Sequence, residues 1–187
     1  MKPILTTAFR RRPDTAPDSE APMRIAVAYQ DTESLVQAIQ FCDRIVQEYW
    51  QDFEIECTWW KLSFLQHPQL FKEAVHAATE ADLILLSLPA EKPIAKTVED
   101  WIDEWIDKRR FRPGALVSLI PGTADAGSAH LAMEGYLTEV ASRSALDYFP
   151  HHLQRSEVEA RGLQQISPRI LESLPVEEPT PRWGINE

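Results

Sequence analysis

Residues 30–34, with the sequence QDTES, bring two hydroxyl groups to the expected start of a helix. Backbone N–H groups at a helix N-terminus attract anions, and the hydroxyls of Thr32 and Ser34 can add hydrogen bonds to a phosphate. Asp31 and Glu33 place negative charge at the same point, and Asp is a preferred N-cap residue. We therefore predict that Asp31 caps the helix and that phosphate binding is disfavoured here, with Thr32 and Ser34 kept as candidate cofactor contacts.

A second segment of this type, residues 121–128 (PGTADAGS), follows a later apolar run and also precedes an expected helix. Gly122 allows close approach to the backbone, and Thr123 and Ser128 supply hydroxyls. The segment lacks the Gly-Lys-Ser/Thr ending of a Walker motif. It is either a site for a carboxylate, a phosphate or a flavin edge, or an ordinary capped turn, and both interpretations stay open.

The remaining reactive side chains do not form a recognisable catalytic or metal-binding pattern. His151 and His152 have no paired carboxylate or third ligand at a suitable spacing, so we predict no metal. Cys42 and Cys57 fall in an expected helix and an expected strand, which is typical of small core residues in a reducing compartment. We expect a soluble, cytoplasmic protein.

Basic residues gather in residues 108–112 (KRRFR), at the end of an expected helix. A helix C-terminus favours cations. We interpret this cluster as complementing the dipole of its own helix.

The elements that position these residues alternate between strand and helix patterns. Between the strands, apolar residues recur at helical spacing, which predicts four helices joined by short loops. Such alternation predicts an α/β fold, a three-layer doubly wound sandwich with a five-stranded parallel sheet in the order 2-1-3-4-5. The second and fifth strands are then the edges. The predicted strands cover residues 24–29, 53–60, 82–88, 115–120 and 146–149.

Composition sets the domain boundaries and excludes two classes of partner. We expect a disordered or loosely attached tail over residues 1–22, one domain over 23–153, and a C-terminal extension over 154–187. The chain carries a net charge of -10, which argues against general nucleic-acid binding. No apolar run approaches the roughly 18 residues of a membrane span.

At the level of the fold, the sequence resembles flavodoxins, NADPH-dependent FMN reductases and receiver domains. Pro89 and the segment 94–101 (IAKTVEDW) are similar to the proline-containing loop and helix of the FMN reductases in Pro89, Lys96, Asp100 and Trp101. This resemblance implies FMN held by Thr32, Ser34, Pro89 and residues 122–123 in a dimeric enzyme. Ser87 stands where a receiver domain has its phosphate-accepting Asp.

The C-terminal residues 174–187 (LPVEEPTPRWGINE) combine prolines with Trp183 and Ile185. Proline-rich segments are extended, and a large aromatic side chain is a common binding anchor. Trp183 and Ile185 therefore either dock on their own domain or contact a protein partner, and both interpretations stay open.

Two functional hypotheses remain. The favoured one is a non-catalytic regulatory or protein-interaction module without a cofactor, because each loop that could hold one lacks part of the corresponding motif. The alternative is an FMN-dependent NAD(P)H oxidoreductase of the quinone or FMN reductase type, in the form of a homodimer. Fold alone does not choose between them, so enzymatic activity is left undecided.

Overall fold

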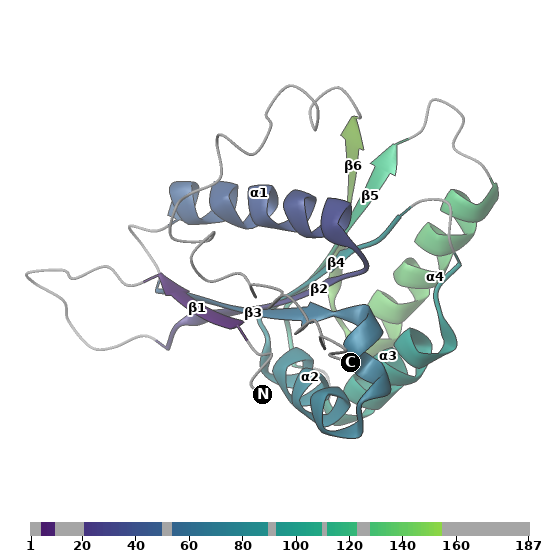
Figure 1. Cartoon of the computed structure of the whole chain (residues 1–187), viewed down its shortest axis with the longest axis horizontal. Helices are drawn as coiled ribbons and strands as arrows, with labels where there is room; N and C mark the ends of the chain where they lie inside the picture. Colours follow the sequence, from purple (N-terminus) through teal and green to yellow (C-terminus); the bar gives the residue numbers. More distant parts are fainter. Residues whose placement is uncertain are drawn as a thin grey trace, which may run out of the picture.

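The computed structural model describes residues 5–9, 21–49, 54–89, 93–109, 112–122 and 128–154 (Figure 1). None of the helices in these ranges is long and apolar enough to cross a membrane. In chain order the elements are β1 (Leu5–Phe9), β2 (Met23–Tyr29), α1 (Thr32–Tyr49), β3 (Ile55–Lys61), η1 (Leu62–Gln66), α2 (Pro68–Glu80), β4 (Leu83–Ser87), α3 (Lys96–Arg109), β5 (Ala115–Gly122), α4 (Ser128–Ser144) and β6 (Asp147–Gln154).

The strands form one sheet in the order β1-β3-β2-β4-β5-β6. Within this order, the five strands β3, β2, β4, β5 and β6 run parallel to one another. Numbered without β1, they have the predicted order 2-1-3-4-5. The prediction of a flavodoxin-like three-layer α/β fold is therefore confirmed.

β1 is an addition that the sequence analysis does not predict. The expectation of a loosely attached tail over residues 1–22 is wrong for Leu5–Phe9, which pairs antiparallel with β3. β3 is consequently an inner strand, whereas the predicted strand order makes it an edge. The physical reason is that β1 pairs with the backbone N–H and C=O groups that β3 would otherwise expose.

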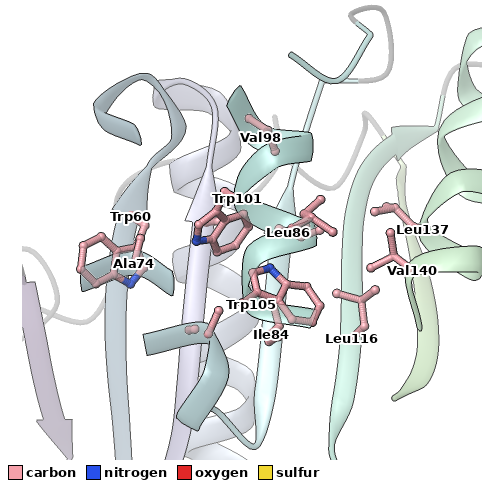
Figure 2. Close-up of a cluster of buried hydrophobic side chains, with 14 of the residues drawn as sticks. Trp60, Ala74, Ile84, Leu86, Val98, Trp101, Trp105, Leu116, Leu137 and Val140 are labelled. Atoms are coloured by element: carbon pink, nitrogen blue, oxygen red, sulfur yellow. The ribbon is translucent and has the colours of Figure 1, made fainter. Parts of the chain in front are cut away.

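The two faces of the sheet bury separate cores. α1 lies on one face, and α2, α3 and α4 lie on the other (Figure 1). Figure 2 shows Trp101 and Trp105 of α3 against Ile84 and Leu86 of β4. The two indole rings meet edge to face with centroids 6.2 Å apart, and both are buried. The apolar stripe of α3 is thus core packing.

Cys42 and Cys57 are free thiols and both are buried, as predicted. They belong to the core beneath α1. A hydrogen bond with Cys57 and burial hold the pKa of Cys42 well above its usual range. The protonated, unreactive form of Cys42 is therefore favoured.

β6 is longer than predicted, because it continues through Pro150 to Gln154. Proline lacks the N–H that an inner strand needs on one of its sides. β6 is the last strand of the sheet that the described residues form, so one row of its backbone groups is not paired with a further strand of that sheet. Pro150 is tolerated for that reason.

At the amino ends of the strands, Arg109 ends α3 with its side chain buried rather than solvated. Its Nη1 donates to the carbonyl oxygens of Ala78 and Ala81 at 3.0 and 2.8 Å. Its Nη2 donates to the carbonyl oxygen of Pro113 at 3.2 Å. These acceptors include the end of α2, so Arg109 caps a neighbouring helix, and the interpretation that it complements its own helix dipole is incomplete.

Candidate functional site

The strand order creates a switch point between β2 and β4. α1 follows β2 on one face of the sheet, while α3 follows β4 on the other (Figure 1). Connections that leave neighbouring strands in opposite directions open a crevice at the carboxyl ends of those strands. The segments after β2 and β4 border this crevice, and they include the predicted residues Thr32, Ser34 and Pro89.

Asp31 and Ser34 close the N-terminus of α1 with reciprocal hydrogen bonds. The N–H of Ser34 donates to Oδ1 of Asp31 at 3.0 Å. The Oγ of Ser34 accepts the N–H groups of Gln30 and Asp31 at 3.0 and 2.8 Å. The prediction that Asp31 is the N-cap is confirmed, and Ser34 completes a capping box.

These bonds occupy groups that a phosphate would need. The N–H groups of Gln30, Asp31 and Ser34 already have acceptors within the chain, and the Asp31 carboxylate stands at the positive end of the helix. Ser34 is buried by its role in the cap, whereas Thr32 is exposed on the first turn. A phosphate bound here would have to open the box and approach a carboxylate.

A cavity of about 300 Å³ lies beside this loop. Its walls come from α3, α4 and the segments that follow β2, β3 and β4, and Gln30 is the polar residue among its described walls. Its volume is at the lower end of the roughly 300 to 1,000 Å³ usual for ligand pockets. The cavity therefore suits a small, largely apolar group. The lining residues are Gln30, Leu62, Leu88, Pro89, Pro93, Ile94, Ala95, Val98 and Met133.

The other predicted site residues are not brought to this cavity by the described structure. Gly122 is the last residue of β5 and pairs with Gln154, and Ser128 is exposed at the start of α4. The described lining of the cavity includes neither of them. Thr123 lies outside the described residues, as do the predicted partner contacts Trp183 and Ile185.

Two buried polar side chains near this end of the sheet are absent from the sequence-based prediction of the site. Gln37 on α1 is 2% exposed and Ser87 at the end of β4 is 0% exposed. Neither the Gln37 amide nor the Ser87 hydroxyl has a hydrogen-bond partner within the described part of the chain. The sequence does contain a signal for the burial of Gln37, because it adjoins the apolar positions Ala38 and Ile39 of the same helix. Such groups normally find a water or ligand partner.

His151 packs between β6 and α1. Its ring meets that of Phe41 edge to face at 5.7 Å between centroids, and its Nε2 lies 3.4 Å from Nη2 of Arg44. Across the described ranges, no group of three or more His, Cys, Asp or Glu side chains is arranged to hold a metal ion. The contacts of His151 thus include an aromatic contact with Phe41 and a hydrogen bond that its Nε2 accepts from Arg44.

A second cavity of about 470 Å³ lies between β2, β3 and α2. Its floor includes Trp60, whose indole N–H donates to Oγ1 of Thr58 at 3.2 Å. Charged residues of β2, β3 and α2 also line it. Among them, Arg24 of β2 pairs with Glu80 of α2 at 3.6 Å. This cavity is amphipathic and is separate from the switch point.

Comparisons with known proteins find similarity to solved structures at low sequence identity. No protein-family model matches the sequence, and no curated protein is significantly similar to it. The chain is similar to the solved structure of Trp repressor binding protein from Bacillus subtilis, with 11% identity, a TM-score of 0.43, and coverage of 70% of this chain and 82% of that chain. It is also similar to azoreductase from Bacillus anthracis str. Sterne, with 11% identity, a TM-score of 0.47, and coverage of 71% and 86%. The flavodoxin-like assignment itself rests on the strand order of the sheet.

Proposed function

We propose that this protein is a non-catalytic regulatory module that binds a small, planar, weakly charged ligand in the switch-point cavity. The observation that carries this proposal is the capping box, in which Asp31 and Ser34 engage three N–H groups that could otherwise bind a phosphate. A ligand of this site gains its affinity from apolar contact rather than from an anionic group.

The lining of the cavity supports binding rather than proton transfer. Apart from Gln30, its described walls are apolar, and they contain no side chain that titrates near neutral pH. Gln30 can orient a ligand through one or two hydrogen bonds. Pro89 and Pro93 provide rigid walls, which lowers the entropy lost when a ring is bound.

A second candidate is an FMN-dependent NAD(P)H oxidoreductase. It is favoured by the position of the cavity, since flavodoxin-like sheets bind FMN at this switch point. In this alternative the flavin ring contacts Pro89, and the phosphate contacts Thr32, Ser34 and residues 122–123, together with Ser128. Binding would require the Asp31–Ser34 box to open.

Riboflavin and FMN separate the two candidates, because they differ by one phosphate. We expect the protein to bind FMN no more tightly than riboflavin when both are titrated and flavin fluorescence is followed. A preference for FMN of about tenfold or more, which corresponds to about 1.4 kcal/mol, would show that the phosphate is recognised and would overturn the module proposal. NADPH oxidation that depends on added FMN would then identify the oxidoreductase.

The cavity itself is tested with Nile red, an uncharged planar dye. We expect the dye to gain fluorescence with the wild-type protein and to lose most of that gain with Ala95→Phe, which adds a phenyl ring to the cavity lining. Ala132→Phe is the matched control, because Ala132 is exposed on α4 beside the lining residue Met133. Equal dye binding by the wild type and both variants would exclude this cavity as the ligand site.

A further inference from the structure

The larger cavity, between β2, β3 and α2, has no part in the function proposed above. Its volume of about 470 Å³ lies within the roughly 300 to 1,000 Å³ usual for ligand pockets. Its described lining has no residue in common with that of the switch-point cavity. Arg24 lines it near the start of β2, whereas Gln30 of the switch-point cavity follows the end of that strand. The two cavities are therefore separate candidate sites.

The apolar part of the larger cavity includes Trp60. This side chain is 6% exposed and belongs to the core beneath α2, and Figure 2 shows it on β3 at the outer side of that cluster. Because its N–H already donates to Thr58, the indole offers a ligand its ring rather than a hydrogen bond. Ala77 of α2 also lines the cavity, and its small side chain leaves room for a second ring beside the indole.

Glu56 brings a carboxylate to the same face of β3. It lies four residues before Trp60, and residues at even spacing along a strand share a face. Cys57 and Trp59, which alternate with this set, belong instead to the core beneath α1. Glu56 and Trp60 both line the cavity, so a charged group and an aromatic ring are available to one ligand.

The charges at the end of the cavity near Arg24 largely compensate one another. Arg24 pairs with Glu80 at 3.6 Å, and Arg112 pairs with the same carboxylate at 3.1 Å. Arg112 also pairs with Asp82 at 2.8 Å. Two guanidinium groups thus face two carboxylates, and an anionic ligand would have to compete with Glu80 and Asp82 for Arg24 and Arg112.

The other charged side chains of the lining leave an excess of negative charge. Glu56 and Glu73 supply two carboxylates, Lys72 supplies one ammonium group, and His76 adds charge only when it is protonated. Glu73 accepts a hydrogen bond from the neutral amide of Gln69, which leaves its charge uncompensated. Within the part of the chain that the structure describes, neither Glu56 nor Lys72 forms an ion pair.

We propose that this cavity binds a small aromatic amine in its protonated form. The ring packs against Trp60, and the ammonium group lies toward the carboxylates of Glu56 and Glu73. Both carboxylates and an indole ring attract a cation, and the ring gains affinity from apolar contact. The net charge of -10 on the whole chain also favours the approach of a cation over that of an anion.

Three naphthalene probes that differ in charge test the ligand class. They are 2-naphthylmethylamine, the neutral 2-naphthylmethanol and the anionic 2-naphthylacetate, each titrated into the full-length protein at pH 8 in a calorimeter. We expect the amine to bind about fivefold or more tightly than the alcohol, and the acetate to bind most weakly. Equal affinity for the three probes, a preference for the acetate, or no binding of the amine would overturn the proposal.

Variants that change one charge test the orientation of the amine. Glu56→Gln keeps the size of the side chain and should weaken amine binding about fivefold without affecting the alcohol. Lys72→Gln removes the like charge and should strengthen amine binding. Glu48→Gln is the matched control, because Glu48 is exposed on α1 across the sheet, and it should change neither affinity. Unchanged amine binding in Glu56→Gln, or weaker binding in Lys72→Gln, would contradict the assignment.

Two further variants distinguish this site from the switch-point cavity. Ala77→Leu places a larger side chain in the lining and should weaken the binding of both the amine and the alcohol, whereas Ala95→Phe should leave both unchanged. The reverse pattern would assign the amine to the switch-point cavity and overturn this inference while leaving the proposed function in place. Circular dichroism checks the fold of each variant, and Glu56→Gln carries the test if Ala77→Leu does not fold.

Discussion

Ser34 determines the chemistry available at the start of α1. Its hydroxyl is an acceptor for two backbone N–H groups, and its own N–H reaches the Asp31 carboxylate. Ser34, a candidate cofactor contact in the sequence, therefore has a structural role in the cap. The same hydroxyl cannot serve a ligand and the cap at once, so the cost of opening the cap opposes anion binding.

Replacing Ser34 with Ala should destabilise the protein by about 1 kcal/mol, because the N–H groups of Gln30 and Asp31 lose their acceptor. Chemical denaturation followed by circular dichroism measures the change. Thr32→Ala is the control from the same turn, since Thr32 is exposed, and it should be close to neutral. Equal losses in the two variants would contradict the role of the capping box.

Gly114 is a second position where the side chain has a structural consequence, because there is no room for a Cβ atom. A Cβ added there would lie 2.5 Å from Nη2 of Arg109 and 2.5 Å from the carbonyl oxygen of Asp82. Arg109 cannot move aside easily, because its guanidinium is held by the carbonyls of Ala78 and Ala81. Gly114 is therefore needed for the close approach of β5 to this cluster.

Gly114→Ala should lower the free energy of unfolding by about 1 to 3 kcal/mol through this overlap. Gly135→Ala offers a matched control, because nothing lies within 4 Å of a Cβ at that position in α4. There the substitution should raise stability by about 0.5 to 1 kcal/mol, since Ala is the better helix former. Urea midpoints of the two variants should move in opposite directions, and a shared direction would refute the argument.

At the scale of elements, β1 changes the environment of a whole strand. It pairs with β3 from Leu5↔Trp59 to Phe9↔Ile55, so that β3 has a neighbour on each side. An unpaired edge exposes a row of donors and acceptors that can pair with another chain. β1 therefore protects the parallel part of the sheet at one end.

Deleting residues 1–9 should expose β3 without unfolding the five parallel strands. We expect the β3 amides that face β1 to lose protection from hydrogen exchange, while the amides of β4, which lies between β2 and β5, keep theirs. The deleted chain should also aggregate at lower concentration than the full chain. Unchanged exchange in β3 would mean that β1 contributes nothing to the sheet in solution.

At the scale of the whole molecule, the contact between α3 and α4 makes the stability of the folded protein depend on pH in the alkaline range. Arg143 of α4 pairs with Asp103 of α3 at 2.9 Å, and Tyr136 is half-buried near these charges. Burial, followed by the carboxylates of Asp103 and Glu99, raises the pKa of Tyr136 to about 12 from its ordinary value of 10.0. The folded state thus holds the phenol proton more tightly than the unfolded state does.

A pKa that is raised on folding stabilises the protein fully below the unfolded pKa and loses its effect as pH rises through the folded pKa. The contribution of Tyr136 should therefore be constant below about pH 10 and disappear between about pH 10 and 12. Denaturation midpoints measured from pH 8 to 12 test this expectation. Tyr136→Phe removes the titrating group, so its midpoint should fall less steeply over that interval, and parallel curves would contradict the assignment.

Local pattern was sufficient for much of the architecture. The apolar runs of β2 and β4 identify inner strands, the residue spacing of α1 and α3 identifies their buried faces, and Asp31 is recognisable as an N-cap. Each of these features depends on residues that are neighbours in the chain or one helical turn apart. The order of the parallel strands follows from the alternation of elements and the handedness of their connections.

Tertiary packing decided the rest. On α4, Met133, Leu137 and Val140 are among the buried residues while Ala132 is exposed, because the neighbouring α3 and β5 select the face. β1 has five residues and becomes a strand by pairing with β3 about fifty residues away.

Arg109 and the switch-point cavity depend on the same kind of long-range contact. Arg109 is buried because the carbonyl groups at the end of α2 stand beside it. The cavity is lined by residues far apart in the chain, with Gln30, Leu62, Val98 and Met133 among its walls. Capping and periodicity are fixed by interactions within a few residues. The energy of a cavity or a buried charge is set by groups far apart in the chain, and folding alone brings those groups together.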